Sequence, residues 1–245
     1  MKKVSIITSL YKAEKYLKGF LENIVQQTVF SDCELFLLDA NSPENEYDII
    51  KPFLSYANIR YERLEEDPGI YGCWNYMIEN SDSKYITNAN VDDKLFYNCI
   101  ERHIDTLEEF SNFDLAYCIN ILSHTPPVEP ELLSGQQQPY PSGDFSKSNM
   151  LSRNLPHNHP VWRRSIHEDC GLFNEKYFSA SDYDFWLRAS IEFGKEFILI
   201  PETLGIYYFN PEGMSTKNEN RVWISKEETE IRQKYSKILE ESHSV

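Results

Sequence analysis

Short apolar runs alternate with helical stripes along the first half of this chain, and this alternation restricts the fold more than any other feature. Residues 4–9 form a β-branched run, and the apolar residues within 17–25 follow at helical spacings of three and four. Residues 34–38 are almost continuously apolar, which is typical of a strand covered on both faces. Two more short strands, at 59–61 and around Tyr85, are separated by a further helical stripe. The order predicts an α/β fold in which helices flank a mainly parallel central sheet.

The second half of the chain is less regular. The stripe from Phe96 to Phe110 predicts a helix, and residues 114–122 predict a strand. Residues 123–149 are rich in Pro, Gln, Ser and Gly, which is typical of an irregular excursion, and we assign them no secondary structure. The remaining expected elements are a helix at 182–193, a strand at 197–200 and a terminal helix at 224–239.

Composition excludes several classes of protein. The net charge of −15 argues against a nucleic-acid-binding groove and against general affinity for anionic membranes. The five cysteines are widely spaced and form no Cys-x-x-Cys pair, so we expect reduced, mostly buried thiols. No stretch has the length of a membrane span, and residues 1–4 lead directly into the first strand without a signal-peptide core. We therefore expect a cytoplasmic protein.

Polar residues follow three of the expected strands. Residues 9–11, Asp39 and residues 90–93 each come where a strand should end, and ligands of open parallel sheets lie beyond the carboxyl ends of the strands. We therefore expect these segments to converge on one rim. The tetrapeptide Asn90-Val91-Asp92-Asp93 adds paired carboxylates, which suit Mg²⁺ or Mn²⁺ together with the oxygens of a substrate diphosphate. The alternative for the pair is a turn or the N-cap of the following helix.

Five segments, taken in order and spacing, carry a resemblance to a known family. They are residues 5–13, 38–42, 67–75, 90–93 and 181–188. Together they resemble a family-2 glycosyltransferase with the GT-A fold, of the group that assembles surface polysaccharide and lipopolysaccharide. The most specific segment is 67–75, which is close to a Pro-Gly-Ile-Tyr-x-x-Trp-Asn signature of one subgroup. This chain has Asn90 where many members have Asp, and Ser181 where many have Glu.

The resemblance extends over residues 4–210 and implies an inverting, hexosyltransferase-like enzyme in one domain, 1–245. Its parts would be a nucleotide-sugar-binding half (1–122), an acceptor and catalytic half (123–215) and a C-terminal helix (216–245). Asp182 would be the general base, and Asp93 would hold the divalent metal, Mn²⁺ or Mg²⁺. The residues expected to bind the nucleotide sugar are Thr8, Leu10, Tyr11, Asp39, Gly69, Tyr71, Asn75, Asn90 and Asp92. The residues expected near the acceptor or a phosphate are His157, His159 and Trp162.

The expected partners are a nucleotide-sugar donor, with a UDP-sugar favoured, and a saccharide or lipid-linked acceptor; membrane contact would be peripheral at most. Asp39 has a turn-capping role as its alternative, and Asp182 an N-cap role. Two other functions stay open at this point. A nucleotidyltransferase shares an αβ nucleotide site with a carboxylate-held Mg²⁺, although residues 11–13 lack the glycine of a phosphate loop. A noncatalytic nucleotide- or carbohydrate-binding module on the same fold is the alternative from another class.

Overall fold

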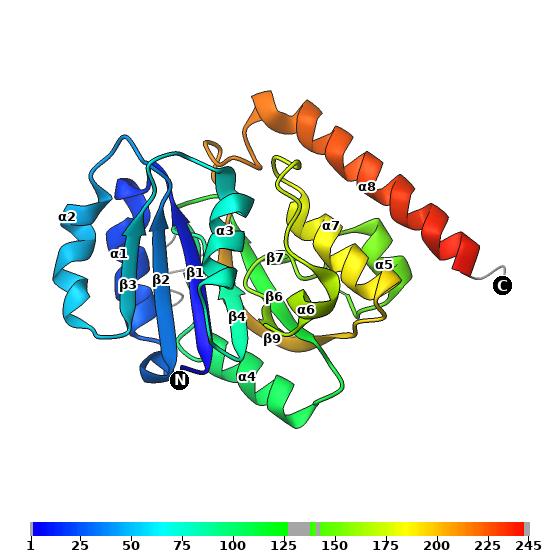
Figure 1. Ribbon diagram of the computed structural model, residues 1–245, viewed down its shortest axis with the longest axis horizontal. Coiled ribbons are helices and arrows are strands. Elements are labelled where there is room, and N and C mark those ends of the chain that lie inside the picture. The colour runs from blue at the N-terminus through cyan, green and yellow to red at the C-terminus, as the bar shows by residue number, and fades with distance from the viewer. Residues whose placement is uncertain (1, 127–137, 141–142, 243–245) are drawn as a thin grey trace.

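Nine strands form one sheet in the part of the chain that the computed structural model describes, residues 2–126, 138–140 and 143–242. The order is β3-β2-β1-β4-β8-β6-β9-β5, and β7 pairs with the end of β6 (Figure 1). The strands are β1 (Val4–Leu10), β2 (Cys33–Asp39), β3 (Ile59–Arg63), β4 (Tyr85–Asn88), β5 (Lys94–Leu95), β6 (Leu115–Ser123), β7 (Gln138–Tyr140), β8 (Val161–Arg163) and β9 (Phe197–Tyr208).

Helices cover both faces of this sheet. They are α1 (Glu14–Val25), α2 (Glu46–Ile50), α3 (Gly69–Glu79), α4 (Cys99–Glu109), α5 (Lys147–Ser152), α6 (Ile166–Cys170), α7 (Ser181–Leu187) and α8 (Arg221–Ser242). Short 3-10 turns lie at Phe30–Asp32, Lys51–Ser55 and Asn218–Asn220, and a π-helical turn, Arg188–Glu192, follows α7. None of the helices within the described ranges combines the length and apolarity needed to cross a membrane.

The core is divided between the two faces because side chains of a strand alternate in direction. Ile6 packs with α1 and α4 on one face, whereas Ile7 packs with α3, α7 and α8 on the other. This explains the almost unbroken apolar character of β1 and β2, which are buried on both sides. The predicted parallel arrangement is confirmed for β3-β2-β1-β4 and for the pair β6-β9.

The structure adds antiparallel strands that the sequence did not reveal. β8 runs antiparallel between β4 and β6, and β5 pairs antiparallel with β9. Strands of two or three residues are too short to display a period, so neither was expected; the same holds for the short helices α2, α5 and α6. The expected helix from Phe96 begins only at Cys99, because the Phe96 N–H bonds Leu204 O at 2.9 Å beside the β5-β9 pair.

β9 is three times as long as the strand expected at 197–200. The strand continues through Pro201 and Glu202 because its pairing with β6 is irregular there. Ile200 lies opposite Cys118 and Thr203 lies opposite Ile119, so the proline is accommodated in a bulge. Of the excursion expected at 123–149, residues 127–137 and 141–142 lie outside the described residues, while its end contains β7 and the start of α5.

Candidate active site

The carboxyl ends of β1, β2 and β3 form one side of the site. The strand register aligns Leu10 with Asp39 and Asp39 with Arg63, so these residues share one rim, as expected from their positions. Asp39 is fully buried. Its Oδ1 accepts from the Ser42 N–H at 2.8 Å, and its Oδ2 accepts from the Tyr61 hydroxyl at 2.9 Å and from Arg63 at 2.7 Å.

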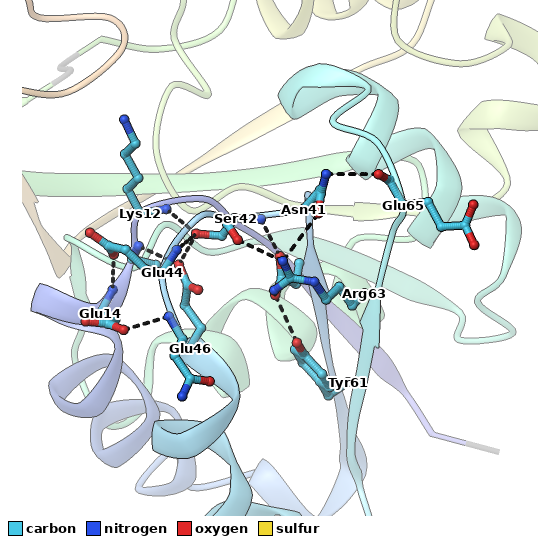
Figure 2. Close-up of polar contacts among 12 residues, drawn as sticks. Lys12, Glu14, Asn41, Ser42, Glu44, Glu46, Tyr61, Arg63 and Glu65 are labelled. Atoms are coloured by element: carbon cyan, nitrogen blue, oxygen red, sulfur yellow. Dashed lines mark hydrogen bonds and ion pairs between the residues drawn. The ribbon is translucent and has the colours of Figure 1, made fainter.

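Figure 2 shows the polar network around this rim, in which Ser42, Tyr61 and Arg63 point toward one another. The Ser42 hydroxyl also donates to buried Glu46 at 2.6 Å, and Arg63 donates to Ser42 O at 2.8 Å. The bond from Ser42 N–H is the turn-capping contact weighed for Asp39. Because Arg63 donates to the other oxygen, Asp39 closes the turn and also orients Arg63 at the rim.

The three residues in and after β1 that were expected to bind the nucleotide sugar, Thr8, Leu10 and Tyr11, lie at different depths. Tyr11 is 50% exposed, whereas Leu10 is fully buried. Thr8 is buried as well, and its hydroxyl donates to Ala89 O at 3.0 Å, which ties β1 to the loop that carries Asn90. Only Tyr11 of the three therefore offers a side chain that a ligand can reach at this rim.

The two aspartates at 92 and 93 have different surroundings. Asp93 is 3% exposed and both of its oxygens are occupied: Oδ1 accepts from the Tyr208 N–H at 2.9 Å, and Oδ2 from Asn158 at 2.7 Å and Asn90 at 3.1 Å. Asp92 is partly exposed, and Asn210 donates to its Oδ2 at 3.0 Å. The geometry therefore favours Asp92 over Asp93 as the carboxylate that a metal ion can reach.

The electrostatic surroundings of the Asp92–Asp93 pair also favour a bound cation. Burial raises the pKa of Asp93 well above its ordinary value, and the neighbouring charge of Asp92 raises it further. Burial likewise raises the pKa of Asp92, against the hydrogen bond from Asn210. Two desolvated carboxyl groups side by side are stabilised in their ionised form by a nearby positive charge, which a divalent ion supplies. The pair is not an N-cap, because α4 is preceded by Asn98.

Two of the donors to Asp93, the Tyr208 N–H and the Asn158 amide, come from the second half of the chain. Asn158 reaches Asp93 because β8 runs antiparallel to β4. Thr87 lies opposite Val161, so the residues before Val161 reach the level of the loop after β4. His159 lies behind Asp93: its Nδ1 is 3.0 Å from Asn120 Oδ1, and its Nε2 is 3.8 Å from Asp93 Oδ2. Burial lowers the pKa of His159 to about 3, so the ring is neutral at pH 7. The roles of Asn120 and Asn158 had no signal in the sequence, since they depend on this strand pairing.

Asp182 stands at the opposite side of the site, in the first turn of α7. The N-cap of that helix is Ala180, so the N-cap alternative for Asp182 is wrong. The Tyr71 hydroxyl donates to Asp182 Oδ1 at 3.0 Å, and the Asn154 amide donates to Oδ2 at 2.7 Å. Burial raises the pKa of Asp182, and these two hydrogen bonds, which favour the ionised form, act against it.

A cavity of about 470 Å³ lies beside Asp182, and the residues of the Asp39 rim and the Asp92–Asp93 pair are not among those that line it. Asn90 from the loop after β4 lines it together with Asp182, and Tyr71 and His157 contribute aromatic walls. His157 packs edge-on against Tyr140 and Tyr207, each with ring centroids 4.8 Å away, and burial lowers its pKa to about 4. Cationic groups are present too, as Arg153 and Arg232 are among the lining residues. The loop Met214 to Thr216 also contributes to the wall.

Several expected site residues lie elsewhere. Trp162 belongs to β8 and is fully buried in the core, where its indole N–H donates to His167. An acceptor therefore cannot reach it. Asn75 is buried and exchanges two hydrogen bonds with the backbone of Phe173, which makes it a tie between α3 and that loop. Gly69 starts α3 with φ +78°, a conformation that favours glycine.

Cysteine and histidine side chains also gather away from this cavity. Cys99, His103 and Cys118 are buried, and one potential ligand atom of each lies within 4.8 Å of the others. Sulfur contacts with Cys99 lower the pKa of Cys118 to about 6. All five cysteines are free and buried, as expected.

Comparison with known proteins gives one family and several solved structures. The family described as "Glycosyl transferase family 2" matches residues 5–167. A chondroitin synthase of Pasteurella multocida is 27% identical over 198 residues, which are 78% of this chain and 19% of that protein. The curated relatives that match first are much longer, and this chain spans 31% of their length or less.

Two solved structures show the likeness in three dimensions. TarS of S. aureus, in complex with UDP-GlcNAc, matches with a TM-score of 0.72 at 17% identity, over 87% of this chain and 61% of that one. A mannosyltransferase from Pyrobaculum calidifontis, in complex with GDP-Man and Mn²⁺, matches with a TM-score of 0.66 at 13% identity, over 86% and 58% of the two chains. These likenesses confirm the expected GT-A fold.

Proposed function

This chain belongs to glycosyl transferase family 2, and on that premise we propose that it transfers a sugar, with inversion, from a nucleoside diphosphate sugar to a hydroxyl group of a saccharide or lipid-linked acceptor. The observation that carries the proposal is the cavity that both Asp182 and Asn90 line. Asp182 is an anchored carboxylate suited to a base, and Asn90 connects the cavity wall to the Asp92–Asp93 pair through its hydrogen bond to Asp93 at 3.1 Å.

The donor nucleotide binds along the β1-β2-β3 rim in this proposal. Asp39 is fully buried and both of its oxygens are bonded, so it would accept from an N–H of the base in place of the Tyr61 hydroxyl or Arg63, and exposed Tyr11 would cover one face of the ring. Arg63, which donates to Asp39 Oδ2 at 2.7 Å, would fix the orientation of that carboxylate. A uracil base offers the single N–H that this arrangement needs, and TarS, the neighbour with the higher TM-score, was solved with UDP-GlcNAc.

A divalent ion, Mn²⁺ or Mg²⁺, would sit on the partly exposed Asp92. When bound, such an ion acts as a Lewis acid on the departing diphosphate. Asp93 would support it from beneath by fixing the loop through the Tyr208 backbone and the two asparagines, Asn90 and Asn158. The mannosyltransferase neighbour was solved with Mn²⁺, which supports a metal of this kind.

Asp182 would remove the proton from the acceptor hydroxyl as that oxygen attacks the sugar carbon from the face opposite the leaving diphosphate. Its raised pKa makes it a stronger base than an exposed carboxylate, and general base catalysis contributes about 10²–10⁴-fold. Tyr71 and Asn154 hold both oxygens, which fixes the direction of the carboxylate toward the cavity. The chondroitin synthase relative supports a saccharide as acceptor.

Calorimetric titration with UDP, GDP and dTDP, each with and without Mn²⁺, tests the donor side. We expect one nucleotide to bind in a Mn²⁺-dependent way, and Asp92→Ala to remove the Mn²⁺ dependence. The control is Asp82→Ala, which removes an exposed carboxylate on the opposite end of β4. Binding of no nucleotide, or binding that ignores Mn²⁺ and Asp92, would overturn the proposed donor site.

A further inference from the structure

The carboxylate of Glu227, on α8, is bonded to the backbone of the loop that leads into α7. Its Oε1 accepts from the Phe178 N–H at 2.5 Å, and its Oε2 accepts from the N–H groups of Ser179 at 3.0 Å and Ala180 at 3.2 Å. Three consecutive backbone donors on one half-buried carboxylate fix both the position and the orientation of these peptides. Glu227 lies 47 to 49 residues later in the chain than its partners, so this is a tertiary contact.

This loop is connected directly to Asp182. Ser179 N–H is bonded to Glu227. The Tyr71 hydroxyl has one proton, which it shares between Ser179 O at 2.8 Å and Asp182 Oδ1 at 3.0 Å. Because Ala180 is the N-cap of α7, a shift of the loop also turns the helix that carries Asp182. Glu227 and Tyr71 therefore hold the loop from its N–H side and its carbonyl side.

α8 itself is fixed firmly enough to impose this position. Ile231 and Tyr235 are fully buried against α7 and α5, beside which α8 runs in Figure 1. The Tyr235 hydroxyl donates to the buried Asp184 of α7 at 3.0 Å, and Lys234 reaches the same oxygen at 3.3 Å. These contacts lie about two turns beyond Glu227 on the same helix. The side chain thus projects from a rigid element.

We propose that Glu227 is a positioning residue for Asp182, and that α8 thereby belongs to the transfer apparatus although it lies outside the segment that matches the family. The inference rests on the proposed role of Asp182 as general base. Removing the carboxylate leaves three backbone N–H groups without their partner, and the loop then moves to find water or another acceptor. Displacement of a reacting group by about 1 Å costs on the order of 10²-fold in rate.

Replacing Glu227 separates positioning from binding. We expect Glu227→Ala to lower kcat for hydrolysis of UDP-GlcNAc, or of GDP-Man if calorimetry selects GDP, by about 10–100-fold. KM for the donor and Kd for the nucleotide should stay within about twofold, because the donor rim does not contact this loop. Glu227→Gln keeps one acceptor oxygen, so its kcat should lie between those of Glu227→Ala and the native chain. The same variant tests the proposal if Glu227→Ala does not fold.

The matched control is Glu241→Ala, which removes the same charge from the same helix at a side chain 68% exposed and 3.9 Å from Lys237. It should leave kcat unchanged. Retention of kcat within about twofold in folded Glu227→Ala or Glu227→Gln, while Asp182→Asn lowers kcat by about 10²–10⁴-fold, overturns the positioning role. Retention of turnover in Asp182→Asn instead overturns the general base, so the two failures are distinguishable. Equal losses in kcat and nucleotide affinity would also contradict positioning, since they indicate general damage to the fold.

Discussion

Asp39 and Asp182 are the carboxylates that we propose for donor binding and for base catalysis, and their hydrogen-bond partners come from different distances along the chain. Asp39 is held by Ser42 in its own turn and by Tyr61 and Arg63 on the neighbouring parallel strand. Asp182 is held by Asn154 and by Tyr71, which is 111 residues away. The nucleotide side is thus built from consecutive βα units, whereas the acceptor side is assembled from remote segments. Changes at each side should therefore have separable effects.

The largest expected effect follows from Asp182→Asn. The amide cannot accept the proton of the acceptor hydroxyl, so we expect kcat to fall by about 10²–10⁴-fold. Nucleotide affinity should not change, since Asp182 lines a cavity that the Asp39 rim does not line. Steady-state release of nucleoside diphosphate and calorimetry on the same preparation check this. Weaker nucleotide binding in this variant would contradict the division into two sides.

The reverse pattern is expected for Asp39→Asn. Loss of a charge-assisted hydrogen bond costs about 1.5–3 kcal/mol, so nucleotide affinity should fall by about 10–100-fold. At saturating donor, kcat should remain near that of the native chain. Calorimetry measures the affinity, and thermal unfolding tests whether the loss of the Arg63 pair also destabilises the rim. A fall in kcat at saturating donor without a change in nucleotide affinity would contradict a role of Asp39 in donor binding.

Glycine substitutions compare how the two halves tolerate added volume. A Cβ at Gly205 of β9 would lie 2.5 Å from Asn120 Oδ1 and 2.9 Å from His159 Nδ1, so Gly205→Ala should destabilise the fold by about 1–3 kcal/mol. A Cβ at Gly19 of α1 would meet no heavy atom within 4 Å, and Gly19→Ala should stabilise the fold by about 0.5–1 kcal/mol. Urea unfolding measures both changes; equal signs would contradict this reading of the packing.

The smallest effect concerns pH. A base must be deprotonated, so kcat falls as the pH drops through the pKa of Asp182. Asn154 donates to the carboxylate and lowers that pKa against the effect of burial. Asn154→Ala should therefore raise the pKa of Asp182 and move the acid limb of the kcat profile to higher pH. A limb that stays in place, or moves to lower pH, would show that Asn154 does not stabilise the ionised base.

The Asp92–Asp93 pair illustrates what the sequence could and could not provide. Its position after the fourth strand was predicted, and the strand order places it at the expected end of β4. The sequence did not predict which of the two aspartates is exposed, because exposure depends on which one accepts hydrogen bonds from the Tyr208 backbone and from Asn158. Both partners arrive through β8 and β9, and neither the antiparallel insertion of β8 nor the length of β9 has a periodic signal.

The acceptor side shows the same limit. The resemblance located Asp182 and Tyr71, and both line the cavity. It also suggested Trp162, whose burial follows from the central place of β8 between β4 and β6. Glu227 had no signal at all, since its function depends on how a distant helix packs.

The sequence by itself determined the class of fold, the rim of β1 to β4 and the family, because hydrophobic periods and short motifs are local properties of the chain. The tertiary structure alone decided which carboxylate is accessible, which donors orient the base and which side chains are core. These properties depend on burial and on contacts between segments far apart in sequence, and desolvation and hydrogen bonding act only once those segments have met.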